Sequence, residues 1–398
     1  MFLSAGCQIL EALLCDPGLA IEGNERRDGE RCLRDQTRII DTLFGAVSIT
    51  RHGYYDAQAG SSRYPLDEAL QLLDGFTPAT AKLICRFASR EPYQVASTEL
   101  AATTGLRIDP RRIQRLVQKV GPAFRKLQNA LPQQEEKAPR MYVLADGTGI
   151  PMRPDVLRGR KGKQPDGSAK TQEVKVGCVF SEHPQADEDP VRDPHSTTYV
   201  ATMKPSDQFG PMLRAEARRR NIGAADEMVF ISDAAHYFKE IARTCFPQAT
   251  WVLDFYHASE HLHELVHTIY NPETKKAQNL ARMWTRWLLN DKVDRIVKRA
   301  RQLAPQGLLE NINHQLQYFE KHRDGMMYKT FSDKGYFIGS GVVEAGCKTL
   351  IGKRLKQSGM FWSEDGAENI LAFRSAIFSE NYDDIWQLNV RRQARQAA

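Results

Sequence analysis

The pattern of apolar and polar positions changes at about residue 140, from helical spacing to short runs typical of strands. The runs lie at 141–150, 171–180, 196–203, 228–235 and 249–257. Helical spacing appears between the later runs, at 206–220 and 236–246. Three successive strands followed by alternating strands and helices predict an α/β fold with a mixed sheet and helices on its faces.

The segment before residue 140 has mostly helical periodicity, as in QILEALL and ATAKLICRFA. One alternating run, from Phe44 to Tyr55, predicts a ribbon of strand. We therefore expect a mostly helical N-terminal domain over 1–131. The polar, Pro-bounded segment PQQEEKAPR, at 132–140, predicts a linker after it.

A helix-turn-helix is one interpretation of residues 97–120. Two predicted helices are separated at Thr104-Gly105, and Asp109 is a suitable N-cap for the second. Its N-terminal half carries three arginines, Arg111, Arg112 and Arg115. A second helix of this kind can enter the major groove of DNA, and an ordinary helical hairpin with a basic face is the alternative.

The rest of the chain predicts a sheet interrupted by helices. After Asn271-Pro272 the pattern is helical and without strands to about residue 325, and two more helices are expected at 339–359 and 364–380. We assign the first part of the core to 141–271, a helical insertion to 272–330, a second part of the core to 331–386, and a basic tail to 387–398.

Composition narrows the class of protein. Of 398 residues, 41% are hydrophobic and 26% charged, and no run of 18 apolar residues predicts a membrane span. The seven cysteines are far apart and form no CxxC pair. This pattern favours a reducing compartment and argues against a zinc site made of cysteines. We expect a cytoplasmic protein. Its net charge is +6. Basic stretches, which indicate a polyanionic partner, lie at 153–163, 214–220, 292–301 and 348–356.

Three acidic residues lie at positions where their carboxylates could bind a metal ion or take part in catalysis. Asp146 and Asp233 each end a predicted apolar strand, and Glu344 lies in the first turn of a helix after a Gly-Ser-Gly sequence. Carboxylates at the carboxyl edge of a sheet share one crevice and repel each other unless a divalent cation neutralises them. Mg²⁺ prefers such a partial carboxylate cage. The alternatives are turn formers for the aspartates and, for Glu344, the helix dipole or a pair with Lys348.

Ordered blocks of the sequence resemble bacterial insertion-sequence DDE transposases of the ISKra group, which are related to the Mutator-like transposases. The blocks are FGAVSITRHGYY with PLDEAL, YVLADGTGIPM with EVKVGCVF, ISDAAHYF, WVLDFYHASEHL, and GSGVVEAGCKTLIGKRLKQSGMFWSEDGAENILAFR. Together they cover most of residues 38–386. The last block is the most specific because so many matching residues recur within it.

The resemblance implies an RNase H-like catalytic core split by a helical insertion, with Asp146, Asp233 and Glu344 as the metal-binding triad. Asp254 and His257 match the D-x-x-H signature of Mutator-like enzymes. Asp254 also ends a predicted strand, so it is the alternative to Asp233 as second ligand. Such an enzyme uses Mg²⁺ or Mn²⁺ to cut double-stranded DNA at terminal inverted repeats and joins the 3′-hydroxyl ends to target DNA.

Further expectations follow from this resemblance. Four basic residues on or near the Glu344 helix are placed to neutralise DNA phosphates, namely Lys348, Lys353, Arg354 and Lys356. Pairing two transposon ends implies a homodimer or higher oligomer, associated with the bacterial nucleoid. A catalytically inactive, transposase-derived DNA-binding protein is the alternative function.

The sequence His263-Glu264-Leu265-Val266-His267 satisfies the HExxH pattern of zinc metalloproteases. At 100° per residue, the apolar stripe of this helix runs through Leu262, Leu265, Val266 and Ile269, which places both histidines on its polar side. No third ligand follows at a suitable spacing. Solvent-facing histidines are therefore the favoured interpretation, and a metalloprotease is a distant third function.

Overall fold

The sheet that the sequence predicts lies in the second of two units of the chain. The computed structural model describes residues 2–397 except 17, 18, 20, 22, 23, 136 and 184–190. Unit 1 comprises Met1–Leu131 and Lys353–Ala398, and unit 2 comprises Pro132–Gly352. Residue 136, within the predicted linker, and residue 398, the end of the predicted tail, lie outside the described residues.

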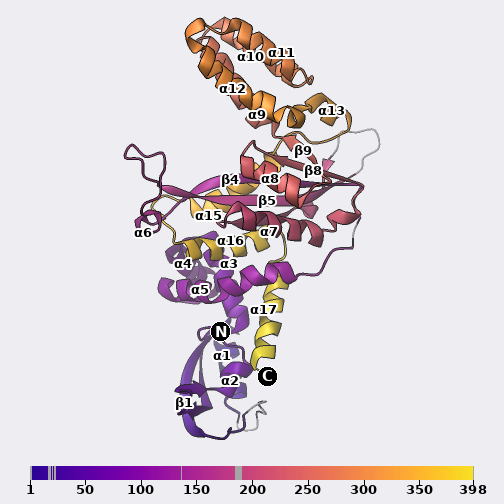
Figure 1. Cartoon of the computed structure of the whole chain (residues 1–398). Helices are drawn as coiled ribbons and strands as arrows, with labels where there is room; N and C mark the ends of the chain where they lie inside the picture. The colour runs from indigo at the N-terminus through magenta and orange to yellow at the C-terminus, as the bar shows by residue number, and fades with distance from the viewer. Residues whose placement is uncertain are drawn as a thin grey trace. The chain divides into compact units, whose positions relative to one another are not determined.

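Unit 2 contains a mixed sheet that, in the described part of the chain, has six strands (Figure 1). They are β4 (Arg140–Pro151), β5 (Thr171–His183), β6 (Val191–Arg192), β7 (Thr198–Thr202), β8 (Glu227–Ser232) and β9 (Thr250–Leu253). The order is β6-β5-β4-β8-β9, with β7 also paired to β5. Strands β4, β5 and β7 are antiparallel neighbours, whereas β8 and β9 run parallel to β4. The mixed sheet is confirmed, and its order is that of an RNase H-like core.

The alternation of side chains along β4 separates two faces of this sheet. Met141, Val143 and Ala145 pack in the core under α7 (Ser206–Arg219) and α8 (His236–Cys245). On the other face Tyr142 stacks on Phe180, with ring centroids 5.0 Å apart. The short helix α14 (Gly341–Gly346) also packs on β4 and β5. Asp146 has the parity of Tyr142, so its side chain leaves the strand on the α14 face.

The end of β4 differs from the prediction. Asp146 does not end the strand, which continues to Pro151 because β5 pairs with it as far as Thr171. The parallel ladder to β8 does stop there, at Ala145 opposite Ser232. Asp146 therefore lies at the edge where β8 ends, although its own strand extends further.

The predicted helical insertion is confirmed. Strand β9 leads into α9 (Phe255–Ile269), and the helices after it are α10 (Lys275–Leu288), α11 (Val293–Leu303), α12 (Leu309–His322) and α13 (Tyr328–Asp333). Figure 1 shows α10, α11 and α12 together on the orange part of the chain. Trp284, Ile296 and Leu316 are fully buried in this bundle. The apolar stripes of these amphipathic helices therefore form a core of their own.

After the insertion the chain returns to the sheet as α14. A π-helical turn follows at Cys347–Gly352, and then α15 (Lys353–Leu355) begins the second segment of unit 1. The sequence predicted one continuous helix here, and the structure adds the π-helical turn. Such turns are frequent at functional sites.

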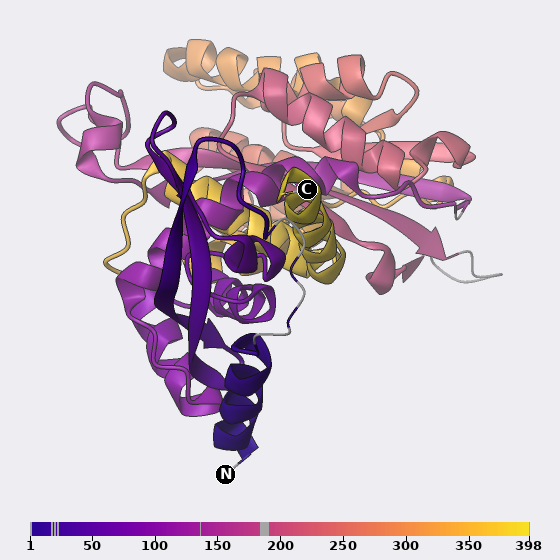
Figure 2. The same ribbon diagram turned by 90° about the horizontal axis from the view of Figure 1, so that it is seen from below.

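Unit 1 begins with a helix on a sheet. Helix α1 (Phe2–Leu14) packs against β2 (Gly45–Asp56), which pairs with β1 (Glu30–Thr42) and β3 (Ser61–Arg63) (Figure 2). The alternating run at 44–55 is confirmed as β2. Strand β1 escaped prediction because almost all of it is exposed or half-buried, so it lacks a regular apolar alternation.

The other helices of unit 1 pack around α5. They are α2 (Pro65–Ala69), α3 (Pro78–Arg90), α4 (Tyr93–Thr104), α5 (Pro110–Leu127), α16 (Glu364–Phe378) and α17 (Tyr382–Ala397). Phe124 on α5 contacts Phe373 on α16 and Trp386 on α17, with centroids 4.9 and 5.8 Å away. The helix pair around Thr104-Gly105 is confirmed, with Gly105 in the left-handed conformation and Asp109 as N-cap.

This packing corrects one predicted boundary. Residues 353–386 do not group with the sheet, because α16 is buried against α3 and α5 and belongs to unit 1. Residues 387–397, expected as a basic tail, continue helix α17. Of the helices that the structure describes, none is long and apolar enough to cross a lipid bilayer.

Candidate active site

Asp146 is the central acid of the candidate site. Its Oδ1 accepts a hydrogen bond from the backbone N–H of Gly147 at 2.7 Å, and its Oδ2 accepts one from the Cys347 thiol at 3.3 Å. Burial raises the pKa of the Asp146 carboxyl, and the nearby Glu344 carboxylate raises it further. The Cys347 and Gly147 hydrogen bonds and the charge of His257 lower that pKa in part.

Asp233 follows directly after β8. Its Oδ1 accepts from the backbone N–H of Ala235 at 2.9 Å, which fixes the turn into α8. Burial raises the pKa of Asp233, and the carboxylates of Asp146 and Glu173 raise it further. The Ala235 hydrogen bond and the charge of His257 act in the opposite direction. Asp146 and Asp233 are thus two acids that repel one another at the carboxyl edge of the sheet.

Ser340 connects the third acid to Asp254. The Ser340 hydroxyl donates to Oε1 of Glu344 at 2.8 Å, and its backbone N–H donates to Oδ1 of Asp254 at 2.7 Å. The second oxygen of Asp254 accepts from the backbone N–H of His257 at 3.0 Å, so Asp254 is the N-cap of α9. The D-x-x-H spacing therefore closes a helix cap in this fold.

Asp233 and Asp254 differ in what their oxygens do. Both oxygens of Asp254 accept backbone hydrogen bonds, and the residue is only 4% exposed. Asp233 is half-buried, and its pKa responds to the charge of Asp146. The geometry therefore favours Asp233 over Asp254 as a partner of Asp146 in binding a cation.

The donor set suits a hard divalent cation, since all three acids offer carboxylate oxygens. Asp146 experiences the negative charges of both Glu344 and Asp233, which a cation would neutralise. The carboxylates are not yet arranged as a cage. Among the residues that the structure describes, no three His, Cys, Asp or Glu side chains converge in a metal-binding arrangement.

A fourth carboxylate, Glu173 on β5, adjoins the site and was not predicted. Its Oε1 accepts from the Tyr237 hydroxyl at 2.6 Å, and its Oε2 pairs with Lys175 at 2.9 Å. A Cβ on Gly147 would lie only 2.6 Å from Oε1 of Glu173, so glycine at this position leaves room for that carboxylate. The glycine directly after Asp146 is the sequence feature that could have indicated a neighbouring side chain at this point. Cys347 and Ser340 were also missed, because neither residue type marks a catalytic site by itself.

The three predicted arginines on α5 have different surroundings. Arg112 pairs with Asp41 at 2.7 Å and lies over the Phe76 ring, 4.5 Å from its centroid, so its charge is already neutralised within unit 1. Arg115 lies 3.6 Å from Asp74, and Arg111 is exposed. Of the three, Arg111 and Arg115 are the more accessible to a phosphate.

Arg354 corrects a further prediction. It is fully buried, its Nε donates to the carbonyl of Ala88 at 3.1 Å, and its guanidinium lies 4.8 Å from the centroid of the Trp362 ring. Burial lowers its pKa to about 10. Arg354 therefore stabilises the interior of unit 1 and does not present its charge to DNA. Lys348 in unit 2, and Lys353 and Lys356 in unit 1, are exposed.

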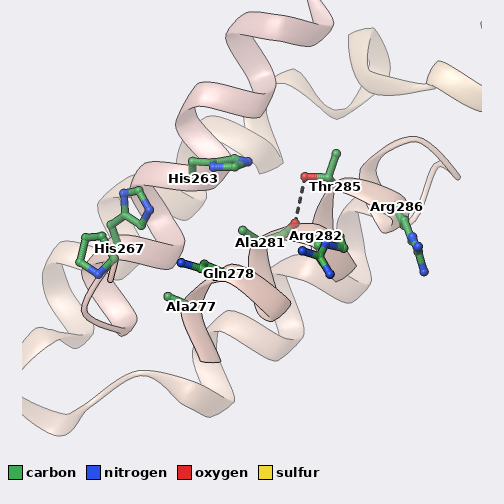
Figure 3. Close-up of a pocket in the computed structure, with 9 residues that line it drawn as sticks. His263, His267, Ala277, Gln278, Ala281, Arg282, Thr285 and Arg286 are labelled. Atoms are coloured by element: carbon green, nitrogen blue, oxygen red, sulfur yellow. Dashed lines mark hydrogen bonds between the residues drawn. The ribbon is translucent and has the colours of Figure 1, made fainter. Parts of the chain in front are cut away.

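The histidines of the HExxH sequence are exposed on α9, as predicted. His263 and His267 have ring centroids 6.2 Å apart and line a cavity of about 430 Å³ between α9 and α10 (Figure 3). Within the described ranges, no third metal-binding side chain completes a site with them. The structure therefore gives no support to a zinc protease.

Comparison with known families gives a match over part of the chain. Residues 189–328 match the family model of the ISL3 DDE transposases, whose description is "Transposase". This segment includes Asp233 and Asp254 but ends before Glu344. The narrower resemblance to the ISKra group and the Mutator-like enzymes is not confirmed by this match and stays a prediction.

No curated protein matches the sequence. Among solved structures, the chain is similar to the Drosophila P element transposase strand transfer complex, with 9% identity and a TM-score of 0.38 over 78% of this chain and 93% of that one. A likeness at this level carries no argument about this chain. The family match therefore supports an insertion-sequence transposase in the broad sense, over the part of the chain that it covers.

Proposed function

We propose that this chain is a DDE transposase that cleaves DNA at the ends of an insertion sequence and transfers the freed 3′-hydroxyls to target DNA. One observation carries the proposal. Asp146 on β4 lies within electrostatic reach of both Asp233 and Glu344, at the edge of an RNase H-like sheet. The family match over 189–328 supports the same class.

The residues of the site have separate roles in this proposal. Asp146, Asp233 and Glu344 would hold Mg²⁺ or Mn²⁺, which supplies Lewis acidity and activates a nucleophile. The Cys347 thiol and the Gly147 N–H orient Asp146, and the Ser340 hydroxyl orients Glu344. His257 is close enough for a positive charge on its imidazole to lower the pKa of both Asp146 and Asp233. Asp254 ties α9 to the segment before Glu344, so it is a positioning residue.

Two phosphoryl transfers complete the reaction. In cleavage, a water oxygen forms a bond to phosphorus while the bond from phosphorus to the 3′-oxygen breaks, and the water proton leaves to solvent or a base. In strand transfer, the freed 3′-hydroxyl attacks a target phosphodiester, loses its proton and displaces another 3′-oxygen. The number of phosphodiester bonds is conserved in the second step, so no external energy source is required.

The partner in this proposal is double-stranded DNA, and pairing of two ends requires at least two copies of the chain. Exposed Lys348 in unit 2, and exposed Lys353 and Lys356 in unit 1, are the candidates for phosphate contacts. Each contact contributes about 0.9 to the slope of log K against log salt concentration. Changing one lysine to Gln should reduce that slope by about this amount if it contacts DNA. A bacterial cytoplasm with the protein on the nucleoid is the matching location.

The test uses purified full-length protein, labelled DNA that carries the inverted repeats flanking the gene, and Mg²⁺ or Mn²⁺. We expect metal-dependent cleavage that is lost in Asp146→Asn, Asp233→Asn and Glu344→Gln while DNA binding persists. Glu310→Gln is the matched control, because Glu310 is an exposed acid on α12. Specific binding without cleavage in either metal would instead support the inactive, transposase-derived DNA-binding protein.

A further inference from the structure

The cavity between α9 and α10 is not used by the proposed chemistry. It is lined by His263, His267, Pro272, Ala277, Gln278, Ala281, Arg282, Thr285 and Arg286. In Figure 3, His263 extends from α9 toward the part of α10 that carries Ala281 and Thr285, and Gln278 extends from α10 back toward α9. We call this set of residues the α9–α10 groove.

Small side chains shape the groove. Ala277 and Ala281 are buried one turn apart on α10 and form the floor. The hydroxyl of Thr285 donates to the Ala281 carbonyl at 2.9 Å, so it is already engaged within the helix. Trp284 and Leu288, both fully buried, anchor α10 in the bundle. The groove is therefore a fixed feature of the insertion, and its polar rim is formed by longer side chains.

The charged side chains that line the α9–α10 groove are all basic. Within the described part of the chain, the groove lining includes two arginines and two histidines but no carboxylate. Helix α10 carries four basic residues and no acidic one, Lys275, Lys276, Arg282 and Arg286. The structure shows no ion pair for the exposed Arg282 and Arg286 among the residues that it describes. Their charges are thus available to an external anion.

The basic residues are also aligned. At 100° per residue, Lys275, Arg282 and Arg286 fall within about 40° of each other around α10. From Lys275 to Arg286 this row spans about 16 Å at 1.5 Å per residue. That length exceeds one small anion and matches several phosphates of one DNA strand, which follow each other at about 3.4 Å along the helix axis.

We propose that the α9–α10 groove and the adjoining basic row bind the phosphate backbone of double-stranded DNA. The inference rests on the proposed function and extends it, because it gives the helical insertion a DNA contact separate from the carboxylate site. Arg282 and Arg286 form charge-assisted hydrogen bonds to phosphate oxygens, and Gln278 and the two histidines contribute further hydrogen bonds. Backbone contacts of this kind hold DNA in position and carry no sequence information.

The test measures DNA binding by the full-length protein at several salt concentrations. We expect Arg282→Gln/Arg286→Gln to reduce the slope of log K against log salt by about two, since each lost phosphate contact removes about 0.9. Lys298→Gln/Arg299→Gln is the matched control, because it removes two exposed charges from α11. We also expect Gln278→Glu, which adds a negative charge inside the groove, to weaken binding at low salt more than Asn313→Glu on α12.

The outcomes separate this inference from the proposed function. Wild-type protein that binds no DNA would overturn both. Wild-type binding with the same salt slope in the Arg282/Arg286 variant would overturn the groove alone and leave the transposase proposal in place. An equal loss of slope in the α11 control would also overturn it, because it would show a diffuse effect of charge. All substituted positions are exposed, and thermal unfolding of each variant verifies that it is folded.

Discussion

The roles of Asp254 and Asp233 can be separated by comparing stability with cleavage. Asp254→Ala removes the N-cap of α9 and leaves the backbone N–H of Ser340 without its acceptor. Loss of a cap costs about 1 kcal/mol, and an unsatisfied buried N–H costs about 1–3 kcal/mol. Relief from burying a charged carboxyl, whose pKa burial raises, offsets part of this. We expect a net loss of roughly 2 kcal/mol in the free energy of unfolding, built from these terms.

Calorimetry of the full chain measures this loss. For a unit of this size, 1 kcal/mol lowers Tm by about 2–4 °C, so Asp254→Ala should lower the Tm of the transition that includes unit 2 by roughly 4–8 °C. Asp233→Ala is the matched control. It removes one backbone acceptor at a half-buried position and relieves repulsion with Asp146, so its Tm should change much less.

Cleavage assays complete the comparison. Asparagine keeps one acceptor oxygen and caps a helix as well as aspartate, but its amide nitrogen cannot accept the second backbone N–H. Asp254→Asn should therefore lose only part of the stability that Asp254→Ala loses and should keep DNA cleavage, whereas Asp233→Asn should lose cleavage. The reasoning would be refuted by an Asp254→Asn variant that melts like wild type and no longer cuts DNA. That result would make Asp254 the metal ligand.

Three other predictions follow. Burial raises the folded-state pKa of Asp146 and Asp233, so their contribution to stability is present below the ordinary aspartate pKa of about 3.9 and is lost as pH rises through the raised values. Asp146→Asn/Asp233→Asn should therefore exceed wild type in Tm at pH 7, and the difference should shrink toward zero below pH 4; a constant difference in a pH series of melts would contradict this. Arg354→Ala should lower the stability of unit 1 by about 2–3 kcal/mol, because it removes the hydrogen bond to the Ala88 carbonyl and the packing on Trp362 and leaves a cavity. It should not change the salt slope of DNA binding, and a flatter slope would place Arg354 at the DNA interface. Gly147→Ala should displace Glu173 and weaken its 2.6 Å hydrogen bond with Tyr237, and so lower both DNA cleavage and the melting temperature. Adding Glu173→Ala should restore the melting temperature. Additive effects in this double-mutant cycle would show that the two side chains do not meet.

Much of the sheet was predictable because strands and helices bury one face each. The runs at 141–150, 171–180 and 228–235 correspond to β4, β5 and β8, and the helical insertion follows β9 and α9 as expected. Strand β1 and the end of β4 were not predictable. Both depend on pairing with a neighbouring strand, which satisfies the backbone without requiring an apolar pattern.

The candidate site was partly predictable for a related reason. Asp146 and Asp233 end apolar runs of the sequence, although β4 itself continues past Asp146, and Glu344 lies in the first turn of a helix. These positions mark the three acids in the sequence. Glu173 and Cys347 lie inside such elements, and only the packing of β5 and of the π-helical turn brings them to Asp146. Arg354 shows the converse, because a basic residue in a basic stretch was expected at the surface and is buried.

The amino-acid sequence alone indicated the class of fold, most of its elements, three candidate acids and the exposed histidines of α9. These are local properties, set by the period of apolar positions and by residues at element ends. Tertiary structure alone decided which acid neighbours which, that Asp254 accepts a hydrogen bond from the distant Ser340 backbone, and that α16 belongs to unit 1. Those features depend on contacts between residues far apart in the chain, and local pattern contains no information about such contacts.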